Sequence, residues 1–187
     1  MELISLQGNI IGVISKDYSK DSYENMLVKD IVVKKSAAAL KMVGLDSTVL
    51  ESNFSDLSKG NQNRIILASK LQEKNIVLVD FSVGLTNKDI EFFKRLFKKI
   101  VNYGRKIVLV DKNSSLFFNL VDKIYVINKE IIYETSDMFD KNLGKYIDLP
   151  KIVEFTIKSE NMGIKINHYK ELDELLKAIY RIKSWDI

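Results

Sequence analysis

The chain has 187 residues, of which 46% are hydrophobic, a length that supports one core and one globular unit with an appendage. It contains no cysteine, which excludes disulfides, thiolate metal sites and a cysteine nucleophile and suits a reducing cytoplasm. Its single histidine, His168, has no second ligand or base nearby in the sequence, so a surface role is expected. The net charge of +4 comes from interspersed residues, 29 basic and 25 acidic, so a nucleic-acid-binding module is not expected.

The longest apolar runs have the length of strands and are far shorter than the roughly 18 residues that span a bilayer. The N-terminal residues MELISLQGN lack the early positive charge and apolar stretch of a signal peptide. A contact with a membrane is therefore expected only through a partner.

The first half of the chain predicts short elements. Residues 2–15 alternate loosely around Gly8 and predict two short strands. The alanine-rich stretch KSAAALKMVGL predicts a helix that ends at Gly44. Another helix is expected to begin near Ser58, because the residues that follow place apolar side chains at helical spacing.

The middle of the chain alternates apolar runs with amphipathic helices. NIVLVD is a continuous run of the kind buried in parallel sheets, IEFFKRLFKKIVNYG predicts a helix, RKIVLVDK a second buried strand, LFFNLVD a helix and KIYVIN a further strand. This order predicts an α/β fold with a mainly parallel sheet. NIVLVD and KIVLVD are expected to be adjacent at the centre of the sheet, with the helix that follows Ser58 packed against it.

The C-terminal part predicts two helical segments, residues 150–162 and 170–183. The only proline, Pro150, fits the first turn of the former. We place a boundary near residue 136, which divides a main domain of residues 1–136 from a C-terminal extension of residues 137–187.

Several motifs follow one another in a fixed order: FSDLSKGNQNRIILASKL, NIVLVDFSVGLT, GRKIVLVDKN and VDKIYVINKE. Their order and spacing resemble the second half of an ABC transporter ATPase. In that family a signature loop (LSGGQ) opens a helix, a Walker B strand ends in Asp-Glu, a D-loop follows, and another strand ends in the switch histidine. The resemblance implies that Leu57–Asn61 is the signature, Asp80 the Walker B aspartate, Gly84–Thr86 the D-loop and Val110–Asn113 the switch region.

Further segments extend the resemblance over nearly the whole chain. IIGVISKD resembles the strand that leads to the Q-loop, with Lys16 in place of the glutamine. YIDLPKIVEF, MGIKI and a leucine-rich helix resemble the C-terminal extension of the energy-coupling-factor subfamily, which powers vitamin and metal uptake in bacteria. The resemblance implies a truncated P-loop NTPase-like (ABC ATPase) domain, with a mainly parallel sheet, flanking helices and a small C-terminal helical extension.

The phosphate-binding motif GxxxxGK[ST] is absent from the sequence, whose only Gly-Lys pair is Gly144–Lys145 without the upstream glycine. The resemblance places Phe81 at the catalytic glutamate, Lys112 at the switch histidine and Thr86 at the D-loop aspartate. Phosphoryl transfer depends on such positioned groups. We therefore expect the isolated chain to bind no cofactor and to hydrolyse no ATP.

The signature retains Ser58 and Gly60, while Lys59 and Asn61 replace a glycine and a glutamine. In the family, the signature serine and the amides of the helix N-terminus contact the γ-phosphate of ATP held by a partner subunit. The resemblance thus implies that these four residues face ATP and magnesium at an interface. A simple N-cap role for Ser58 is an equal alternative.

Other residues that the resemblance aligns with nucleotide-facing positions of the family have two interpretations each. Asp80 is a weak candidate for a magnesium ligand, and the alternative is a strand-end aspartate that caps a turn. Lys16 and Lys112 are either solvated side chains or cations that bind an anion.

Three functions stay open. The first is a non-catalytic subunit, at the inner face of the cell membrane, that pairs with an intact ABC-type ATPase and a transmembrane coupling protein and completes or regulates the ATP site. The second is an ATPase with an atypical or separately supplied P-loop, which nucleotide binding by the isolated chain would reveal. The third is a nucleotide-independent adaptor or regulatory module, on which the ATPase activity of a partner would not depend.

Overall fold

The computed structural model describes residues 3–15, 25–32, 36–81, 84–112, 117 and 120–183. Its strands are β1 (Ile10–Ile14), β2 (Asn75–Val79), β3 (Lys106–Asp111), β4 (Lys123–Asn128) and β5 (Glu130–Thr135). Its helices are α1 (Val28–Ile31), α2 (Ser36–Met42), α3 (Lys59–Lys70), α4 (Asn87–Asn102), α5 (Lys151–Asn161) and α6 (Leu172–Lys183), with short 3-10 turns at Leu3–Ser5, Ser47–Glu51, Phe54–Asp56 and Leu143–Lys145.

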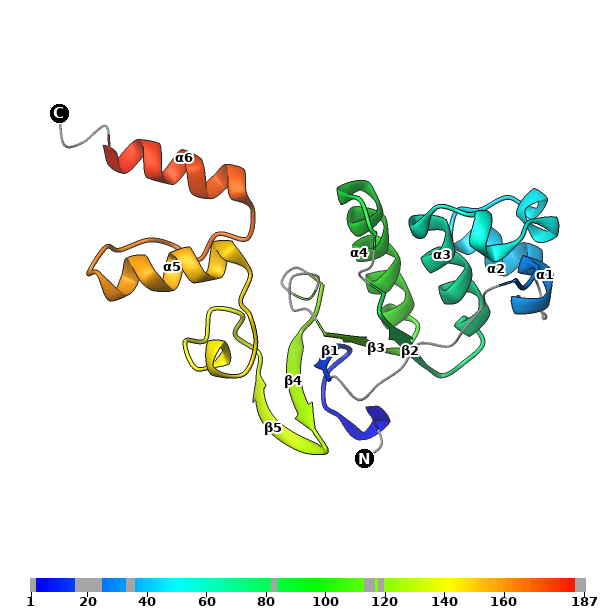
Figure 1. Ribbon diagram of the computed structural model, residues 1–187, viewed down its shortest axis with the longest axis horizontal. Helices are drawn as coiled ribbons and strands as arrows, with labels where there is room; N and C mark the ends of the chain where they lie inside the picture. The colour runs from blue at the N-terminus through cyan, green and yellow to red at the C-terminus, as the bar shows by residue number, and fades with distance from the viewer. Residues whose placement is uncertain are drawn as a thin grey trace.

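The sheet has the order β2-β3-β1-β4-β5 (Figure 1). The first four of these strands are parallel to their neighbours, and β5 is antiparallel to β4. Helices α3 and α4 lie on the same side of the sheet, with α1 and α2 beyond α3 and with α5 and α6 beyond the opposite end (Figure 1). The predicted α/β fold with a mainly parallel sheet is therefore confirmed.

The predicted adjacency of NIVLVD and KIVLVD is confirmed, since β2 pairs with β3 in parallel, with Val79 opposite Val110. Their predicted position at the centre is wrong, because β2 ends the sheet and β1 lies on the other side of β3. All five residues of β1 are buried, whereas buried and half-buried side chains alternate along β2. A strand that is apolar on both faces is best covered in the middle of a sheet, which favours β1 there.

The prediction of two strands in residues 2–15 is wrong. The structure has one strand, β1, preceded by a 3-10 turn at Leu3–Ser5. Leu3 and Leu6 are buried with Ile11 in a cluster on one face of the sheet. This segment thus covers the sheet instead of adding a strand to it, and Gly8 turns the chain with a φ of +123° that favours glycine.

Helices α2, α3 and α4 confirm the helical predictions in this part of the chain. Gly44 follows α2 with a φ of +72°, the left-handed conformation that commonly ends a helix. Ser58 is the N-cap of α3, and α4 begins with a capping box in which Thr86 and Asp89 each satisfy a backbone N–H of the other.

The C-terminal part contains the two predicted helices, α5 and α6, with Pro150 as the N-cap of α5. Strand β5, at the end of the sheet, was not predicted, because its residues EIIYET do not alternate between apolar and polar side chains. Two consecutive isoleucines, Ile131 and Ile132, are both exposed. Phe139 and Val153 belong to the same hydrophobic core as the sheet. The boundary near residue 136 stays a prediction, and the helix expected at LFFNLVD falls largely outside the described residues.

Among the described residues, no helix has the length and apolar character that crossing a membrane requires.

An aromatic cluster fills the core between β2 and α4. The Phe81 ring lies edge-on to Phe93, with ring centroids 4.5 Å apart, and 5.6 Å from the centroid of Phe97. All three side chains are fully buried. Phe81 therefore closes the end of β2 by packing against α4.

We predict that Phe81→Ala lowers the free energy of unfolding by about 3–5 kcal/mol, because truncation of a buried phenylalanine leaves a cavity. Urea denaturation followed by circular dichroism measures the change. Tyr103→Ala is the control, since its side chain is 72% exposed and such positions change stability by roughly 0.5 kcal/mol or less. A Phe81→Ala variant as stable as this control would contradict the packing described.

Candidate functional site

The signature and D-loop segments meet where α3 begins and β2 has ended. A Cβ atom placed on Gly84 would lie 2.7 Å from the Cβ of Lys59, a distance that only glycine tolerates. Gly84 also has a φ of +72°, which glycine adopts without strain. We call the group formed by Ser58–Asn61, Gly84–Thr86 and Asp89 the signature corner.

Gly60 packs against the carboxylate of Asp89. A Cβ on Gly60 would lie 2.8 Å from each carboxylate oxygen of Asp89, so this position has no room for a side chain. A Gly60→Asp substitution would therefore disrupt the packing of the corner. The substitution would force two carboxylates together inside the structure, and a loss of binding would not isolate a phosphate contact.

The Asp89 carboxylate holds the two segments together. It accepts hydrogen bonds from the backbone N–H of Thr86, at 3.1 Å, and from the Thr86 hydroxyl, at 2.6 Å. It also pairs with the Arg64 guanidinium of α3 at 3.3 Å. The hydrogen bond from Thr86 is the largest influence that lowers the pKa of Asp89, and Arg64 adds to it.

Arg64 extends this network toward α2. Its guanidinium lies 4.1 Å from the centroid of the Phe92 ring, a cation–π arrangement, and donates to the carbonyl oxygen of Val43 at 3.3 Å. Asp89 and Arg64 were not recognised in the sequence. The pattern T-x-x-D at Thr86 was the available signal for Asp89, whereas the Arg64 contact joins residues 25 positions apart.

The solvent side of the signature corner presents Ser58 and Lys59, both exposed. The Ser58 hydroxyl accepts from the backbone N–H of Asn61 at 3.3 Å, and Lys59 Nζ donates to Gln62 Oε1 at 3.0 Å. The buried Gln62 donates to the carbonyl oxygens of Phe54 and Leu57 at 3.0 and 3.1 Å. A fixed loop therefore leads into a helix N-terminus, where backbone N–H groups lack intrahelical acceptors and favour an anion.

Asp80 and Phe81 follow β2 directly. Asp80 has a φ of +51°, and its backbone N–H donates to the carbonyl oxygen of Val110 at 2.8 Å. Within the described residues there is no group of three or more His, Cys, Asp or Glu side chains that could hold a metal. The magnesium role of Asp80 stays a prediction, and the Phe81 side chain points into the core.

Lys112 belongs to a different surface. It lines a cavity of about 580 Å³ at the carboxyl ends of β1 and β4, together with Ser15, Asn128 and Lys145. No residue of the signature corner lines this cavity. The structure therefore does not bring Lys112 to the corner, and both Lys16 and Asn113 lie outside the described residues.

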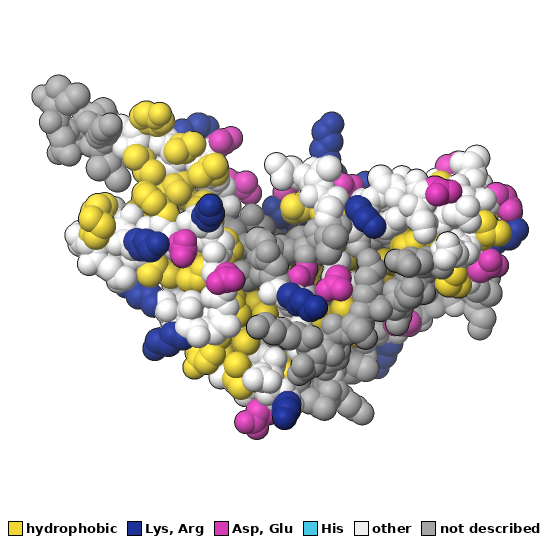
Figure 2. Space-filling view, in the orientation of Figure 1, with side chains coloured by type: hydrophobic (Ala, Val, Ile, Leu, Met, Phe, Trp, Pro, Cys, Tyr) yellow, Lys and Arg dark blue, Asp and Glu magenta, His cyan; other side chains and the backbone are white. Residues whose placement is uncertain are grey.

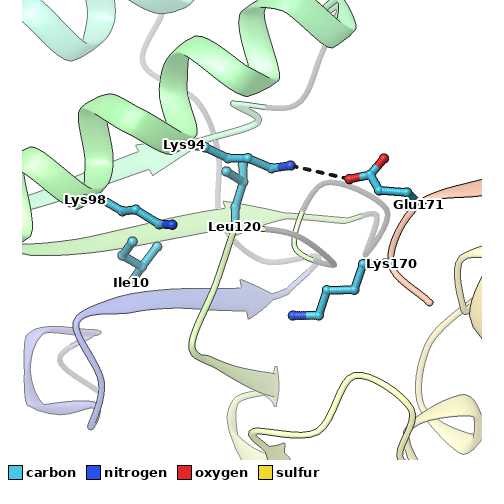
Figure 3. A pocket seen from close by; sticks show the side chains of 6 residues that line it. All are labelled: Ile10, Lys94, Lys98, Leu120, Lys170 and Glu171. Carbon is cyan, nitrogen blue, oxygen red and sulfur yellow. Dashed lines mark ion pairs between the residues drawn. The ribbon is translucent and has the colours of Figure 1, made fainter. Parts of the chain in front are cut away.

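A smaller hollow of about 250 Å³ lies between α4 and the start of α6 (Figure 3). Lys94 and Lys98 of α4 face it from one side and Lys170 from the other, and Ile10 also lines it. Lys94 Nζ lies 3.9 Å from the carboxylate of Glu171. This ion pair connects α4 with the start of α6.

His168 has a packing role. Its ring stacks on Phe139 with centroids 4.1 Å apart, and its Nε2 lies 2.9 Å from the Glu160 carboxylate. These contacts fix the segment between α5 and α6 and fit the surface role that the sequence indicated.

We predict that Asp89→Asn lowers the free energy of unfolding at pH 7 by roughly 1–2 kcal/mol, because hydrogen bonds to a charged group are lost. The lowered pKa of Asp89 means that its contribution is complete above the unfolded pKa of about 3.9 and disappears as the pH falls through the folded pKa. Denaturation at pH 7 and at about pH 3 should therefore show a smaller difference from wild type at the acid pH. Asp173→Asn, on the exposed surface of α6, is the control, and a difference independent of pH would refute the role of the charge.

No protein-family model matches the chain. Among curated proteins it is similar to an energy-coupling factor transporter ATP-binding protein of Spiroplasma kunkelii, with 27% identity over 83% of this chain and 55% of the relative. It is also similar to an ABC transporter ATP-binding protein of Methanocaldococcus jannaschii, with 32% identity over 68% of this chain and 48% of the relative. A Streptococcus pyogenes energy-coupling factor transporter ATP-binding protein is 26% identical over 89% of this chain and 69% of its own length. The chain thus spans about half the length of the first two of these relatives.

Solved structures give the same fold. An ATP-binding cassette in a post-hydrolysis state with ADP and phosphate matches with a TM-score of 0.51 and 19% identity, over 68% of this chain and 62% of its own. Another ATP-binding cassette of an ABC transporter matches with a TM-score of 0.50 and 16% identity, over 66% and 60%. The homologues of this chain are therefore ABC transporter ATP-binding proteins, those of energy-coupling factor transporters among them, and its fold is the α/β fold of an ABC ATPase.

Proposed function

We propose that the chain is a non-catalytic ABC-type subunit that pairs with an intact ATPase and completes or regulates the partner's ATP site in a membrane transporter. The observation that carries this proposal is the signature corner, where a fixed loop presents Ser58 and Lys59 to solvent at the N-terminus of α3. ATP and magnesium would be held by the partner. The chain would reach the inner face of the membrane through that ATPase and a transmembrane coupling protein.

The signature corner suits an anion that is held from outside. The N-terminus of α3 offers backbone N–H groups and the positive end of the helix dipole. Lys59 adds a positive charge, and its methylene groups pack against Gly84. The whole corner would therefore approach a partner's γ-phosphate as one preassembled surface.

The proposed lack of catalysis rests on two features. The sequence contains no GxxxxGK[ST] motif to wrap the phosphates. Phe81, which the resemblance aligns with the catalytic glutamate, has its ring buried against Phe93 and offers no group to orient water. The positioning of the phosphates and the positioning of the attacking water are two separate requirements of phosphoryl transfer.

A nucleotide-independent adaptor is the second candidate. It is favoured because the polar side chains of the corner already have hydrogen-bond partners within the chain. The Ser58 hydroxyl accepts from the Asn61 N–H, and Lys59 Nζ donates to Gln62 Oε1. In that case the corner is only a well-capped helix start. The dependence of partner binding on ATP distinguishes the two functions.

The isolated chain is expected to show no ATP turnover above a buffer blank in a phosphate-release assay with magnesium. A co-purified ATPase could mimic activity, so Asp80→Ala serves as the diagnostic variant. Turnover by the wild type that disappears in Asp80→Ala would establish the atypical ATPase instead.

ATP is expected to tighten the complex with the partner ATPase by about tenfold, within the usual range of coupling between sites. Linkage requires that pairing raise the partner's affinity for ATP by the same factor. Lys59→Glu should abolish this ATP dependence, because it places a negative charge toward the phosphate. Glutamate keeps the β and γ methylene groups that contact Gly84, which preserves the packing that Gly60→Asp would destroy.

The control is Lys74→Glu, which makes the same charge change just beyond the other end of α3. Titration calorimetry measures the affinity of each variant for the co-expressed energy-coupling factor ATPase of the same organism. The ratio of the affinities with and without ATP gives the ATP dependence. If Lys59→Glu leaves this ratio unchanged, the signature role is excluded and the nucleotide-independent adaptor remains as the function.

A further inference from the structure

The hollow between α4 and the start of α6 is lined mainly by lysine. Lys94, Lys98 and Lys170 supply three ammonium groups to it, and Glu171 supplies a carboxylate. Figure 3 shows Lys98 and Lys170 reaching into the hollow from opposite sides. We call it the lysine hollow. Its described lining carries more positive than negative charge.

Only part of this positive charge is neutralised within the chain. Lys94 Nζ lies 2.6 Å from the Glu91 carboxylate and 3.9 Å from that of Glu171. Lys98 follows Lys94 by one helical turn, a spacing at which like charges repel each other, and it forms no ion pair with the described residues. Hydrogen bonding to Lys94 is the main cause that lowers the pKa of Glu91, and the charge of Lys98 acts in the same direction. An added anion would therefore relieve repulsion in the hollow.

The remaining lining is apolar and strengthens the attraction for an anion. Ile10 and Leu120 are only 7% and 6% exposed. They exclude water from part of the wall, and charges next to such a surface interact more strongly than charges in bulk water. Lysine acts as a point charge, without the planar fork with which arginine selects the shape of an anion. The hollow should therefore select anions by their charge.

The size of the hollow limits the ligand to a small molecule. Its volume of about 250 Å³ lies below the roughly 300–1,000 Å³ of sites for drug-sized ligands. On the face of the molecule that Figure 2 shows, basic and acidic side chains are interspersed. An extended polyanion would find no continuous basic surface there.

We propose that the lysine hollow binds a small multivalent anion of the phosphate class, either inorganic phosphate or pyrophosphate. The bound anion would connect Lys98 of α4 with Lys170 and so fasten the start of α6 to the main domain. No residue of the signature corner lines this hollow. The site is therefore separate from the proposed ATP interface and does not depend on the proposed function.

Nuclear magnetic resonance of the nitrogen-15-labelled full chain locates the site. Sodium pyrophosphate, phosphate and chloride are each titrated at a constant ionic strength of about 0.1 M, where charges more than about 10 Å apart are largely screened. Pyrophosphate should shift the amide signals of the lining residues and saturate with a dissociation constant of about 1 mM or tighter. Phosphate should bind more weakly, in line with its smaller charge, and chloride should not saturate.

Two variants should change the affinity for pyrophosphate in opposite directions. Lys98→Gln should weaken binding by about fivefold, the upper range for a charge contact at an exposed site. Its control is Lys99→Gln, the same change at the next residue, which is exposed and does not line the hollow. Glu171→Gln should tighten binding, because it removes a carboxylate that competes for Lys94. Its control is Asp173→Asn, at an exposed position of α6.

Equal weakening by Lys98→Gln and Lys99→Gln would overturn the proposal, because the net charge of the chain would then explain the binding. Shifts centred on other residues, or the lack of saturation by pyrophosphate, would also overturn it. So would Lys98-dependent sedimentation with phosphatidylglycerol vesicles in the absence of pyrophosphate binding, because the phosphate group would then belong to a lipid.

Discussion

The arrangement of the signature and D-loop segments depends on the contacts of one group, the carboxylate of Asp89. It caps the start of α4 through Thr86, binds Arg64 of α3 and lies directly against Gly60. A single charged group with these partners fixes two helices relative to each other, because each partner comes from a different turn of chain. Asp89 is half-buried, and hydrogen bonds to its charged carboxylate are stronger than those between neutral groups. The loops before α3 and α4 have little freedom as a result, and they form one surface instead of two.

This arrangement changes the meaning of glycine in the signature. Close approach of a phosphate is one reason for a glycine at a helix N-terminus. In this chain Gly60 has another reason, since the Asp89 carboxylate occupies the space of a side chain. Gly84 is required in the same way by the side chain of Lys59. Retention of these glycines therefore supports the scaffold directly, and a nucleotide contact must be judged from the exposed Ser58 and Lys59.

The sequence predicted what depends on local pattern. Buried strands such as NIVLVD, the N-cap at Ser58 and the helix end at Gly44 follow from hydrophobic runs and capping residues, and the structure has them. The central place of β1 and the edge position of β2 depend on pairing between distant segments, which periodicity does not encode. The same limit hid the contact between Arg64 and Asp89. It also hid the fact that Lys112 lies on a different surface from the signature corner. Strand β5 was hidden because its residues follow no alternating pattern and none of them is buried.

The attachment of α6 has a consequence for its own stability. In the described residues of this helix only Leu175 is buried, and the ion pair at its start joins partly exposed side chains. An isolated helix of about 12 residues is marginal in water. Its backbone hydrogen bonds should therefore open and close largely independently of the sheet, and amide protons in α6 should exchange with solvent far faster than those of β1.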